Sequence, residues 1–231
     1  MNYGRKHLSV LERMHRHVHG GAYAAVVLSG GYEEAGDCGR FRVTAGDVLF
    51  HDAFDGHLDR AGSLGAEILN LSLPIAGRWP GPIAEVDNPD ELVRAAEQDQ
   101  QTAIGLLLSS CRPVIYNPQD WISVLAVTLS GNANIRLEAW ADAHGLSPAA
   151  LSRGFQRVFG TTPRAFRARL RARRAWRAII RGRLPLGYIA AEFGFADQPH
   201  MTRDVRAVTG STPGAWRAMI KCVQDGKPCL R

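Results

Sequence analysis

Two stretches of this sequence, "LSRGFQRVFGTTPRAFRA" (residues 151–168) and "MTRDVRAVTGSTPGAWRA" (residues 201–218), are variants of one another. At an offset of 50 residues, Arg153 aligns with Arg203, Gly160 with Gly210, and Phe166 with Trp216. A Thr-Pro pair follows the glycine in both stretches. The chain therefore contains the same small structural unit twice.

The composition is that of a globular protein with room for two modest domains, since 45 % of the 231 residues are hydrophobic. No stretch approaches the ~18 apolar residues of a membrane span, and the basic N-terminus lacks the apolar segment of a signal peptide. We therefore expect a cytoplasmic protein with no membrane partner. The four cysteines have no C-x-x-C spacing, which predicts reduced thiols at Cys38, Cys111, Cys222 and Cys229.

Charge divides the chain into two parts. Residues 1–134 carry 10 Lys and Arg against 16 Asp and Glu, a net charge of −6. Residues 135–221 carry 16 against 5, a net charge of +11. A small domain with that positive charge attracts polyanions, of which nucleic acid is the commonest in a cytoplasm, although charge alone also fits a merely soluble Arg-rich surface.

The sequence predicts an α+β protein. Residues 22–73 contain short apolar segments between turn signals such as "SGG", "AGDCG" and "TAGD", which is typical of an antiparallel sandwich or barrel. Helical spacing begins near Asn88, and a further helix, "QDWISVLAVTL", precedes a break at "SGNAN". We expect a β-rich domain at 1–80, linker or dimerisation helices at 81–118, a basic all-α domain at 119–221 and a tail at 222–231.

Each copy of the repeat fits a helix-turn-helix. In the first, predicted over 137–159, a short helix stops at Gly145 and Ser147 caps a second helix. In the second, predicted over 184–208, Gly194 and Asp197 take these places. Such a motif presents its second helix to the DNA major groove, whereas a pair of purely structural helical hairpins explains two copies in a basic domain less well.

The segment between the two copies predicts the distance that separates them. "PRAFRARLRARRAWRAIIR" (residues 163–181) predicts one helix about 28 Å long, against about 34 Å for a turn of B-DNA. The two copies would thus read neighbouring DNA segments. Phe166, Leu170, Trp176 and Ile180 fall on one side of this helix, and on the other lie arginines that contact phosphate or only face solvent: Arg164, Arg167, Arg171, Arg174 and Arg181.

The segment from about residue 121 to 219 resembles the DNA-binding domain of the AraC/XylS family of bacterial transcription regulators, most clearly in "GFADQPHMTRDVRAVTGSTPGAWR". The resemblance implies a cytoplasmic DNA-binding regulator, with promoter or operator DNA as partner. It places base reading on Ala149, Ser152, Arg153, Pro199, His200 and Arg203. Other polar side chains would position the protein on phosphates: Gln156, Arg157, Thr202, Arg206, Arg164, Arg167, Arg171 and Arg174. Two departures are Val205, where the family usually has an aromatic residue, and Ala149, which offers only an apolar contact.

Regulators of this family and size resemble one another in an N-terminal cupin-like barrel, which binds a small effector or mediates dimerisation. Here His17 and His19 match the first cupin motif and His57 the second, but Ala24 stands where the motif has a metal-ligating Glu. Two interpretations stay open: a divalent metal such as Zn²⁺ on His17, His19 and His57, or histidines that line the barrel without metal. His15 is an alternative ligand, because His15, His17 and His19 would share one face of a strand, and His51 could complete the shell.

Two functional classes fit these features. A regulator that responds to an effector is favoured, with a homodimer expected and RNA polymerase as a partner if the protein activates transcription. The alternative is an enzyme: a metal-dependent cupin enzyme fused to a DNA-binding domain, or a DNA-repair methyl acceptor. The methyl acceptor needs a zinc-bound cysteine cluster, and the cupin enzyme a complete metal site, so we expect no enzymatic activity.

Overall fold

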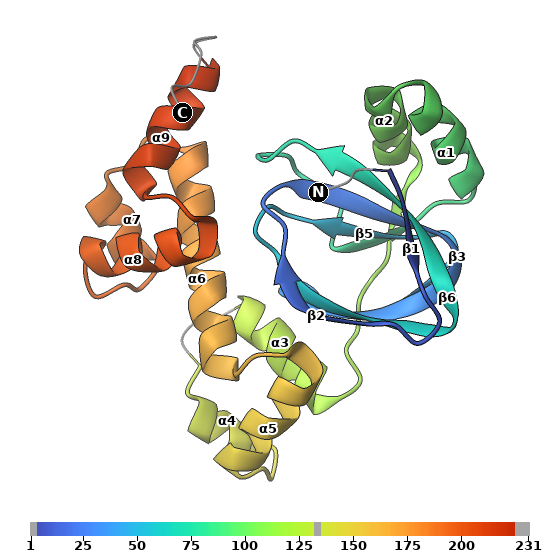
Figure 1. The fold of residues 1–231 in the computed structure, drawn as a ribbon. Coiled ribbons are helices and arrows are strands. Elements are labelled where there is room, and N and C mark those ends of the chain that lie inside the picture. The colour runs from blue at the N-terminus through green and yellow to red at the C-terminus, as the bar shows by residue number, and fades with distance from the viewer. Residues whose placement is uncertain (1–3, 132–134, 225–231) are drawn as a thin grey trace. The chain divides into compact units, whose positions relative to one another are not determined.

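A computed structural model describes residues 4–131 and 135–224 of the chain. It confirms the α+β class: the N-terminal part is an antiparallel sheet and the C-terminal part is helical (Figure 1). The chain forms two compact units, residues 1–163 and 164–231, and each is described by itself. Most of the predicted break at 130–134 and most of the tail at 222–231 lie outside the described residues, as do the side chains of Cys222 and Cys229.

The first unit is built on an eight-stranded antiparallel sheet. Its strand order is β1-β6-β3-β5-β7-β8, while β2 also pairs with β6 and β4 with β3. Two strands lie beyond residue 80, so the sheet extends past the boundary expected for the N-terminal domain. The strands are β1 (Gly4–Leu8), β2 (Arg13–Val18), β3 (Ala22–Gly36), β4 (Gly39–Thr44), β5 (Asp47–His51), β6 (Gly56–Leu73), β7 (Ile83–Glu85) and β8 (Arg112–Pro113).

The predicted turn at "SGG" is wrong, because β3 runs straight through it. The pairing of β3 with β6 shifts register here, between Val27 and Ser29 and again between Gly30 and Tyr32. Gly30 has a φ of +68°, and a Cβ atom there would lie 2.1 Å from the carbonyl oxygen of Gly65 on β6. The glycines therefore mark a bulge and a close approach of two long bent strands instead of a chain reversal.

Two helices complete the core of this unit. Asp99 separates α1 (Pro89–Gln98) from α2 (Gln100–Ser110), and its carboxylate accepts a hydrogen bond from the Thr102 N–H at 2.7 Å. Leu92, Ile104 and Leu107 pack with Val26 and Leu71 in one buried cluster. The region expected to link the two halves is thus also part of the core of the N-terminal sheet.

The remaining helices are those of the repeat. The first unit continues with α3 (Trp121–Gly131), α4 (Leu137–Ala143) and α5 (Pro148–Phe159). The second unit consists of α6 (Pro163–Arg181), α7 (Leu186–Glu192), α8 (Gln198–Thr209) and α9 (Pro213–Gln224). In the second unit Trp176 and Trp216 meet edge to face, with ring centroids 5.5 Å apart. Among the described residues no helix is long and apolar enough to span a membrane.

Candidate nucleic-acid interface and imidazole cluster

The first helix-turn-helix forms as the sequence predicts. Helix α4 ends before Gly145, which has a φ of +65°, and the Ser147 hydroxyl accepts a hydrogen bond from the Ala150 N–H at 3.1 Å. Pro148 then opens α5 at a position where its missing N–H is harmless. Leu151, Phe155 and Val158 are buried, which leaves the opposite side of α5 outward.

The second helix-turn-helix repeats this design. Gly194 has a φ of +70° at the turn, and the Asp197 carboxylate accepts a hydrogen bond from the His200 N–H at 2.6 Å. Met201 and Val205 are completely buried, so a valine fills the inward position of the family's usual aromatic residue. The first helix begins at Leu186, slightly later than predicted.

The shared "G-x-T-P" ends each recognition helix and starts the next helix. Gly160 and Gly210 both adopt the left-handed conformation at the C-cap, with φ of +66° and +77°. Pro163 and Pro213 are the first residues of α6 and α9. Phe166 and Trp216, three residues further on, are both buried. The repeated letters therefore encode a helix stop, a helix start and a core anchor.

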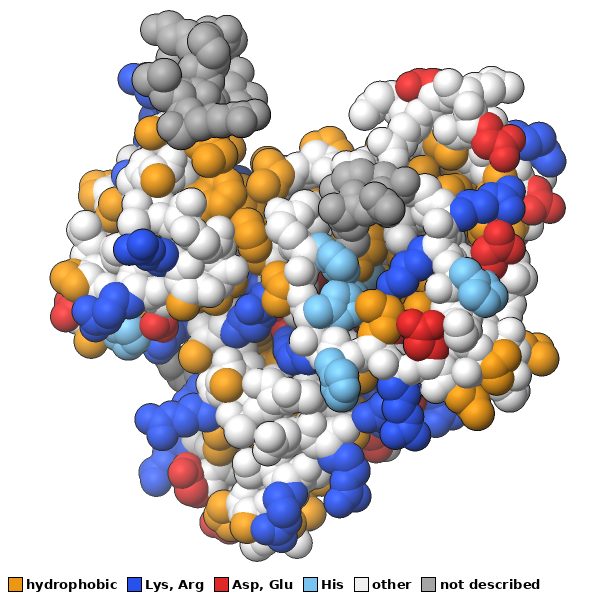
Figure 2. All heavy atoms as spheres, in the orientation of Figure 1, with side chains coloured by type: hydrophobic (Ala, Val, Ile, Leu, Met, Phe, Trp, Pro, Cys, Tyr) orange, Lys and Arg blue, Asp and Glu red, His pale blue; other side chains and the backbone are white. Residues whose placement is uncertain are grey.

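The residues predicted to read bases lie in the N-terminal halves of α5 and α8. Ala149, Arg153, Pro199 and Arg203 are exposed, whereas Ser152 and His200 are half-buried. Of the predicted phosphate contacts, Gln156, Arg157, Arg164 and Arg206 are exposed, and Thr202, Arg167, Arg171 and Arg174 are half-buried. Figure 2 shows Lys and Arg side chains on the surface of both helical regions.

Arg171 also has an internal role in the second unit. Its guanidinium stacks over the Phe195 ring, with Cζ 4.4 Å from the ring centroid. It donates hydrogen bonds to the carbonyl oxygen of Gly194 at 3.3 Å and to the Asp204 carboxylate at 3.2 Å. Asp204 also lies 3.4 Å from His200 Nε2. Arg171 thus ties α6 to the turn and to the recognition helix, a role that the sequence pattern did not predict.

The eight-stranded sheet of the first unit curls on itself (Figure 1) and is here called the barrel. It brings together four histidines, here called the imidazole cluster: His17, His19, His51 and His57. The ring of His57 is centred 4.3 Å from that of His17, 5.3 Å from that of His19 and 4.8 Å from that of His51. In Figure 2, His side chains gather on the barrel face over β2. His15 is instead exposed, because the pairing of β2 with β6 shifts register between Met14 and His17. The prediction of one shared face for all three β2-region histidines was therefore wrong.

A buried carboxyl group that sequence analysis missed lies beside the imidazole cluster. Glu34 Oε2 is 3.4 Å from His51 Nε2. Glu34, His51 and His57 each offer one potential metal-ligand atom, and these three atoms lie within 4.8 Å of one another. The ligand atoms of His17, His19 and His57 also lie within 4.8 Å of one another. Glu34 follows Ala24 by ten residues on β3, so only the continuation of that strand through "SGG" brings it here. A sequence motif confined to one short strand therefore gives no indication that Glu34 lies near the histidines.

Burial governs the protonation of these groups. Burial, and then the neighbouring His51 and His17, holds the pKa of His57 well below its usual value. Burial and then His17 lower the pKa of His19 to about 4. Burial, together with Asp59 and Asp55, raises the pKa of Glu34 well above its usual value. His19 and His57 are therefore neutral at pH 7, which is the form that binds metal ions.

The comparison with protein families supports the helical part of the site. Residues 140–219 match the model of a helix-turn-helix domain. With two capped helix-turn-helix motifs in a strongly basic segment, this match defines the class: the protein is a DNA-binding transcription regulator. The domain is of the AraC type, as the sequence resemblance implied. The enzyme alternative finds no support in this match.

Several solved structures are similar to the chain. ToxT from Vibrio cholerae, with an unsaturated fatty acid bound, is 11 % identical over 94 % of both chains, with a TM-score of 0.43. An AraC-type transcriptional regulator from Chromobacterium violaceum is 24 % identical over 42 % of this chain and 88 % of its own, with a TM-score of 0.39. The C-terminal domain of AraT from Geobacillus stearothermophilus is 19 % identical over 45 % and 88 %, with a TM-score of 0.41. No curated protein matches the chain.

Proposed function

We propose that this regulator reads two neighbouring DNA segments with α5 and α8 and responds to a small effector in its barrel. The observation that carries the first part is the exposure of Arg153 and Arg203 at equivalent positions of the two recognition helices. An Arg fork suits the O6 and N7 atoms of guanine in the major groove. Ser152 and His200 would add polar contacts, and Ala149 and Pro199 would make apolar ones.

Phosphate contacts would fix the register of these helices on DNA. Gln156, Arg157, Thr202 and Arg206 lie on the recognition helices, and the remaining candidates lie on α6: Arg164, Arg167, Arg171 and Arg174. Burial, and then the neighbouring Arg173, lowers the pKa of Arg174, but an arginine stays charged at neutral pH. These side chains would supply the affinity that is independent of sequence.

Selection of bound sequences from random double-stranded DNA by the full-length chain tests this proposal. A recovered site should contain two conserved segments about one helical turn apart, near 34 Å. Affinity for that site should fall steeply with salt concentration, because each phosphate contact releases counterions. Recovery of no preferred sequence at low salt would contradict the proposal.

We propose that the effector site of the barrel includes a divalent metal ion on His17, His19 and His57. His17 Nδ1 donates a hydrogen bond to the His15 carbonyl at 2.9 Å, which leaves the lone pair on Nε2. His57 Nε2 lies 3.3 Å from the Tyr23 hydroxyl, which leaves Nδ1 for a ligand. These two free nitrogens, His17 Nε2 and His57 Nδ1, are buried and have no hydrogen-bond partner among the described residues. Metal-binding histidines are commonly oriented by such a bond on the other ring nitrogen.

Three imidazoles suit Zn²⁺ or a similar ion and leave an open position for a carboxylate or carbonyl of an effector. Elemental analysis of protein purified without a His-tag tests this, together with thermal unfolding with and without Zn²⁺. A bound ion should raise the unfolding temperature of the wild type by mass action, and not that of His57→Ala. Metal below about a tenth of an equivalent, with no Zn²⁺-dependent shift, would favour histidines that line the barrel without metal.

We further propose a homodimer through the outer faces of α1 and α2, where Leu108 remains 40 % exposed. A dimer would place two DNA-binding domains on one operator, and an effector that changes the barrel would change their spacing. If the protein activates transcription, RNA polymerase is the further partner. Sedimentation of the wild type against Leu108→Glu would test the dimer.

A further inference from the structure

The C-terminal end of the first recognition helix, α5, is held by the barrel. The last carbonyl groups of a helix have no partner inside the helix. The usual partner of the Phe159 carbonyl would be the N–H of residue 163, which is a proline. Arg16 of β2 donates a hydrogen bond to that carbonyl at 3.1 Å, and Arg60 of β6 donates one to the Arg157 carbonyl at 2.8 Å. Two cations at a helix C-terminus are also favoured by the helix dipole.

Arg16 is itself fixed from inside the barrel. It pairs with Asp37, whose side chain is completely buried. The other carboxylate oxygen of Asp37 accepts a hydrogen bond from the Gly56 N–H at 3.0 Å. Gly160, the C-cap of α5, lies close to the Arg16 and Leu58 side chains, at 3.1–3.2 Å from where its Cβ would be. The helix end thus rests on a preformed part of the barrel.

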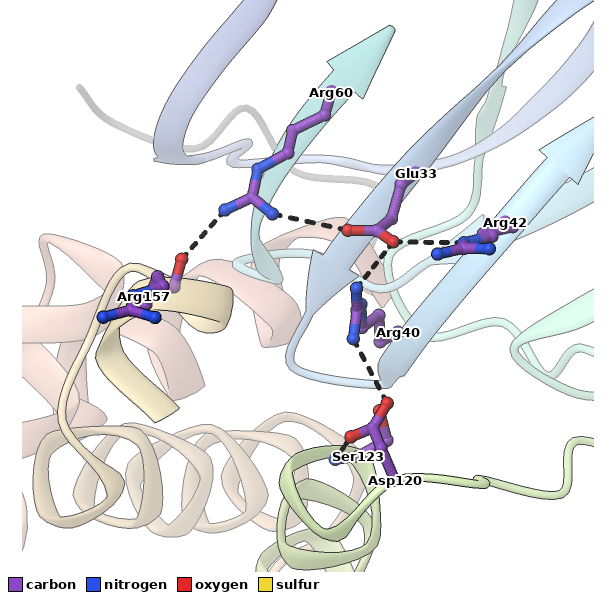
Figure 3. A network of polar contacts seen from close by, with 7 residues as sticks. All are labelled: Glu33, Arg40, Arg42, Arg60, Asp120, Ser123 and Arg157. Atoms are coloured by element: carbon purple, nitrogen blue, oxygen red, sulfur yellow. Dashed lines mark hydrogen bonds and ion pairs between the residues drawn. The ribbon is translucent and has the colours of Figure 1, made fainter. Parts of the chain in front are cut away.

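Arg60 belongs to a network centred on Glu33 of β3 (Figure 3). The Glu33 carboxylate is only 14 % exposed and pairs with three arginines: Arg40 at 2.8 Å, Arg42 at 3.3 Å and Arg60 at 3.5 Å. Figure 3 shows that Arg60 reaches on to α5, while Arg40 reaches Asp120 at the start of α3. Arg42 makes neither connection in the network drawn, and its side chain is 85 % exposed.

Helix α3 gives the barrel a second hold on the first motif. Asp120 caps this helix by accepting hydrogen bonds from the Ser123 N–H at 2.8 Å and the Ser123 hydroxyl at 3.2 Å. Trp121 covers Gly154 of α5 so closely that a Cβ atom there would lie 2.7 Å from the indole ring. Glu33 is therefore connected to α5 directly through Arg60 and indirectly through Arg40 and α3.

These contacts leave the reading side of α5 uncovered. The twelve-residue helix is about 18 Å long, and its barrel contacts are at the C-terminal end. Ala149, near the other end, and Arg153, at the middle of the helix, are exposed. The barrel therefore holds the motif in a state that can meet DNA.

We infer that Arg60 and Arg16 are positioning residues for DNA recognition, through which the barrel orders the first recognition helix before it binds. The inference rests on the proposed function and adds a route for its regulation. Arg16 precedes His17 on β2, and Arg60 lies on β6, the strand that also carries His57. A ligand at the imidazole cluster acts on the same two strands that hold α5.

Loss of the Arg60 contact should weaken binding to the selected site, because the first motif must then be ordered during binding. We expect Arg60→Ala in the full-length chain to lower affinity roughly threefold to tenfold. Hydroxyl-radical footprints should lose protection at the segment read by α5 and keep it at the segment read by α8. Hydrogen exchange of the amides around Gly160 should become faster in the free protein.

Arg42→Ala is the matched control, because it also removes one of the three arginines on Glu33 but none that touches α5. Arg60→Lys should restore part of the affinity, since an ammonium group can also donate to a carbonyl. Arg16→Ala is avoided, because it would leave the buried Asp37 carboxylate without its arginine.

Weaker binding confined to the α5 segment in Arg60→Ala, with Arg42→Ala like the wild type, supports the inference. Equal affinities of Arg60→Ala and Arg42→Ala, tighter binding by Arg60→Ala, or uniform loss over both segments would overturn it. A wild-type chain that selects no DNA sequence at all would instead refute the proposed function.

Discussion

The two helix-turn-helix motifs have the same local design but are held by different partners. Both have a glycine turn, a polar N-cap, a left-handed Gly C-cap and a Thr-Pro start of the next helix. In the first motif, Arg16 and Arg60 of the barrel donate hydrogen bonds to the last carbonyl groups of the recognition helix. In the second motif, the end of the recognition helix is held by α9, because Trp216 Nε1 donates a hydrogen bond to the Thr209 hydroxyl at 2.8 Å. One motif is thus tied to the barrel, and the other is held by its own domain.

The helix that precedes each motif shows the same contrast. Trp121 on α3 and Arg171 on α6 are 50 residues apart, as are their partners Gly154 and Asp204. An indole lies against a glycine in the first copy, and an arginine pairs with an aspartate in the second. Equivalent positions thus hold a recognition helix by apolar packing in one copy and by charge in the other.

The largest expected effect is on DNA recognition itself. Arg153→Ala and Arg203→Ala should each weaken binding to the selected site by about 1–3 kcal/mol, because each removes a bidentate base contact. Each should relax preference at one or two base pairs, and the two sets should lie about one helical turn apart. Competition binding against a panel of single-base variants measures this. Equal loss on every sequence would show that the arginine contacts only phosphate.

Arg171→Met separates an internal role from a phosphate contact. Loss of the ion pair with the half-buried Asp204 and of the stacking on Phe195 should lower the free energy of unfolding by about 1–2 kcal/mol without DNA. Chemical denaturation followed by Trp fluorescence measures this. Arg164→Met is the control, since Arg164 is exposed. Unchanged stability with a smaller salt slope of DNA binding would assign Arg171 to phosphate instead.

The smallest effect concerns two helix-interior glycines. Gly154→Ala should lower the free energy of unfolding by about 1 kcal/mol, because the new methyl group meets the Trp121 ring and forces a shift. Gly105→Ala should raise it by about 0.5–1 kcal/mol, because nothing lies within 4 Å of its Cβ and Ala favours the helix. Thermal unfolding of both variants gives the comparison. Stabilisation by both would mean that Trp121 moves aside freely.

Much of the helical part could be predicted from the sequence because its signals are local. Gly145, Ser147, Gly194 and Asp197 specify turns and caps through their own backbone and side chains, and all four act as predicted. The connecting helix over 163–181 has the predicted bounds. The barrel was predicted less well, since bulges at Gly30 and near His15 depend on the pairing of distant strands. These bulges explain why Glu34 lies beside the imidazole cluster and why His15 does not lie on the predicted face.

The sequence by itself determined the two recognition helices, their caps and the basic charge around them, because helices are stabilised by contacts between residues a few positions apart. Only the tertiary structure decided which groups meet across long separations: Glu34 with His51, Trp121 with Gly154, and Arg60 with the Arg157 carbonyl. The last pair lies 97 residues apart in the chain and involves a backbone oxygen, which every residue possesses. No residue type in the sequence indicates such a partner, so only the folded chain shows which carbonyl oxygen Arg60 contacts.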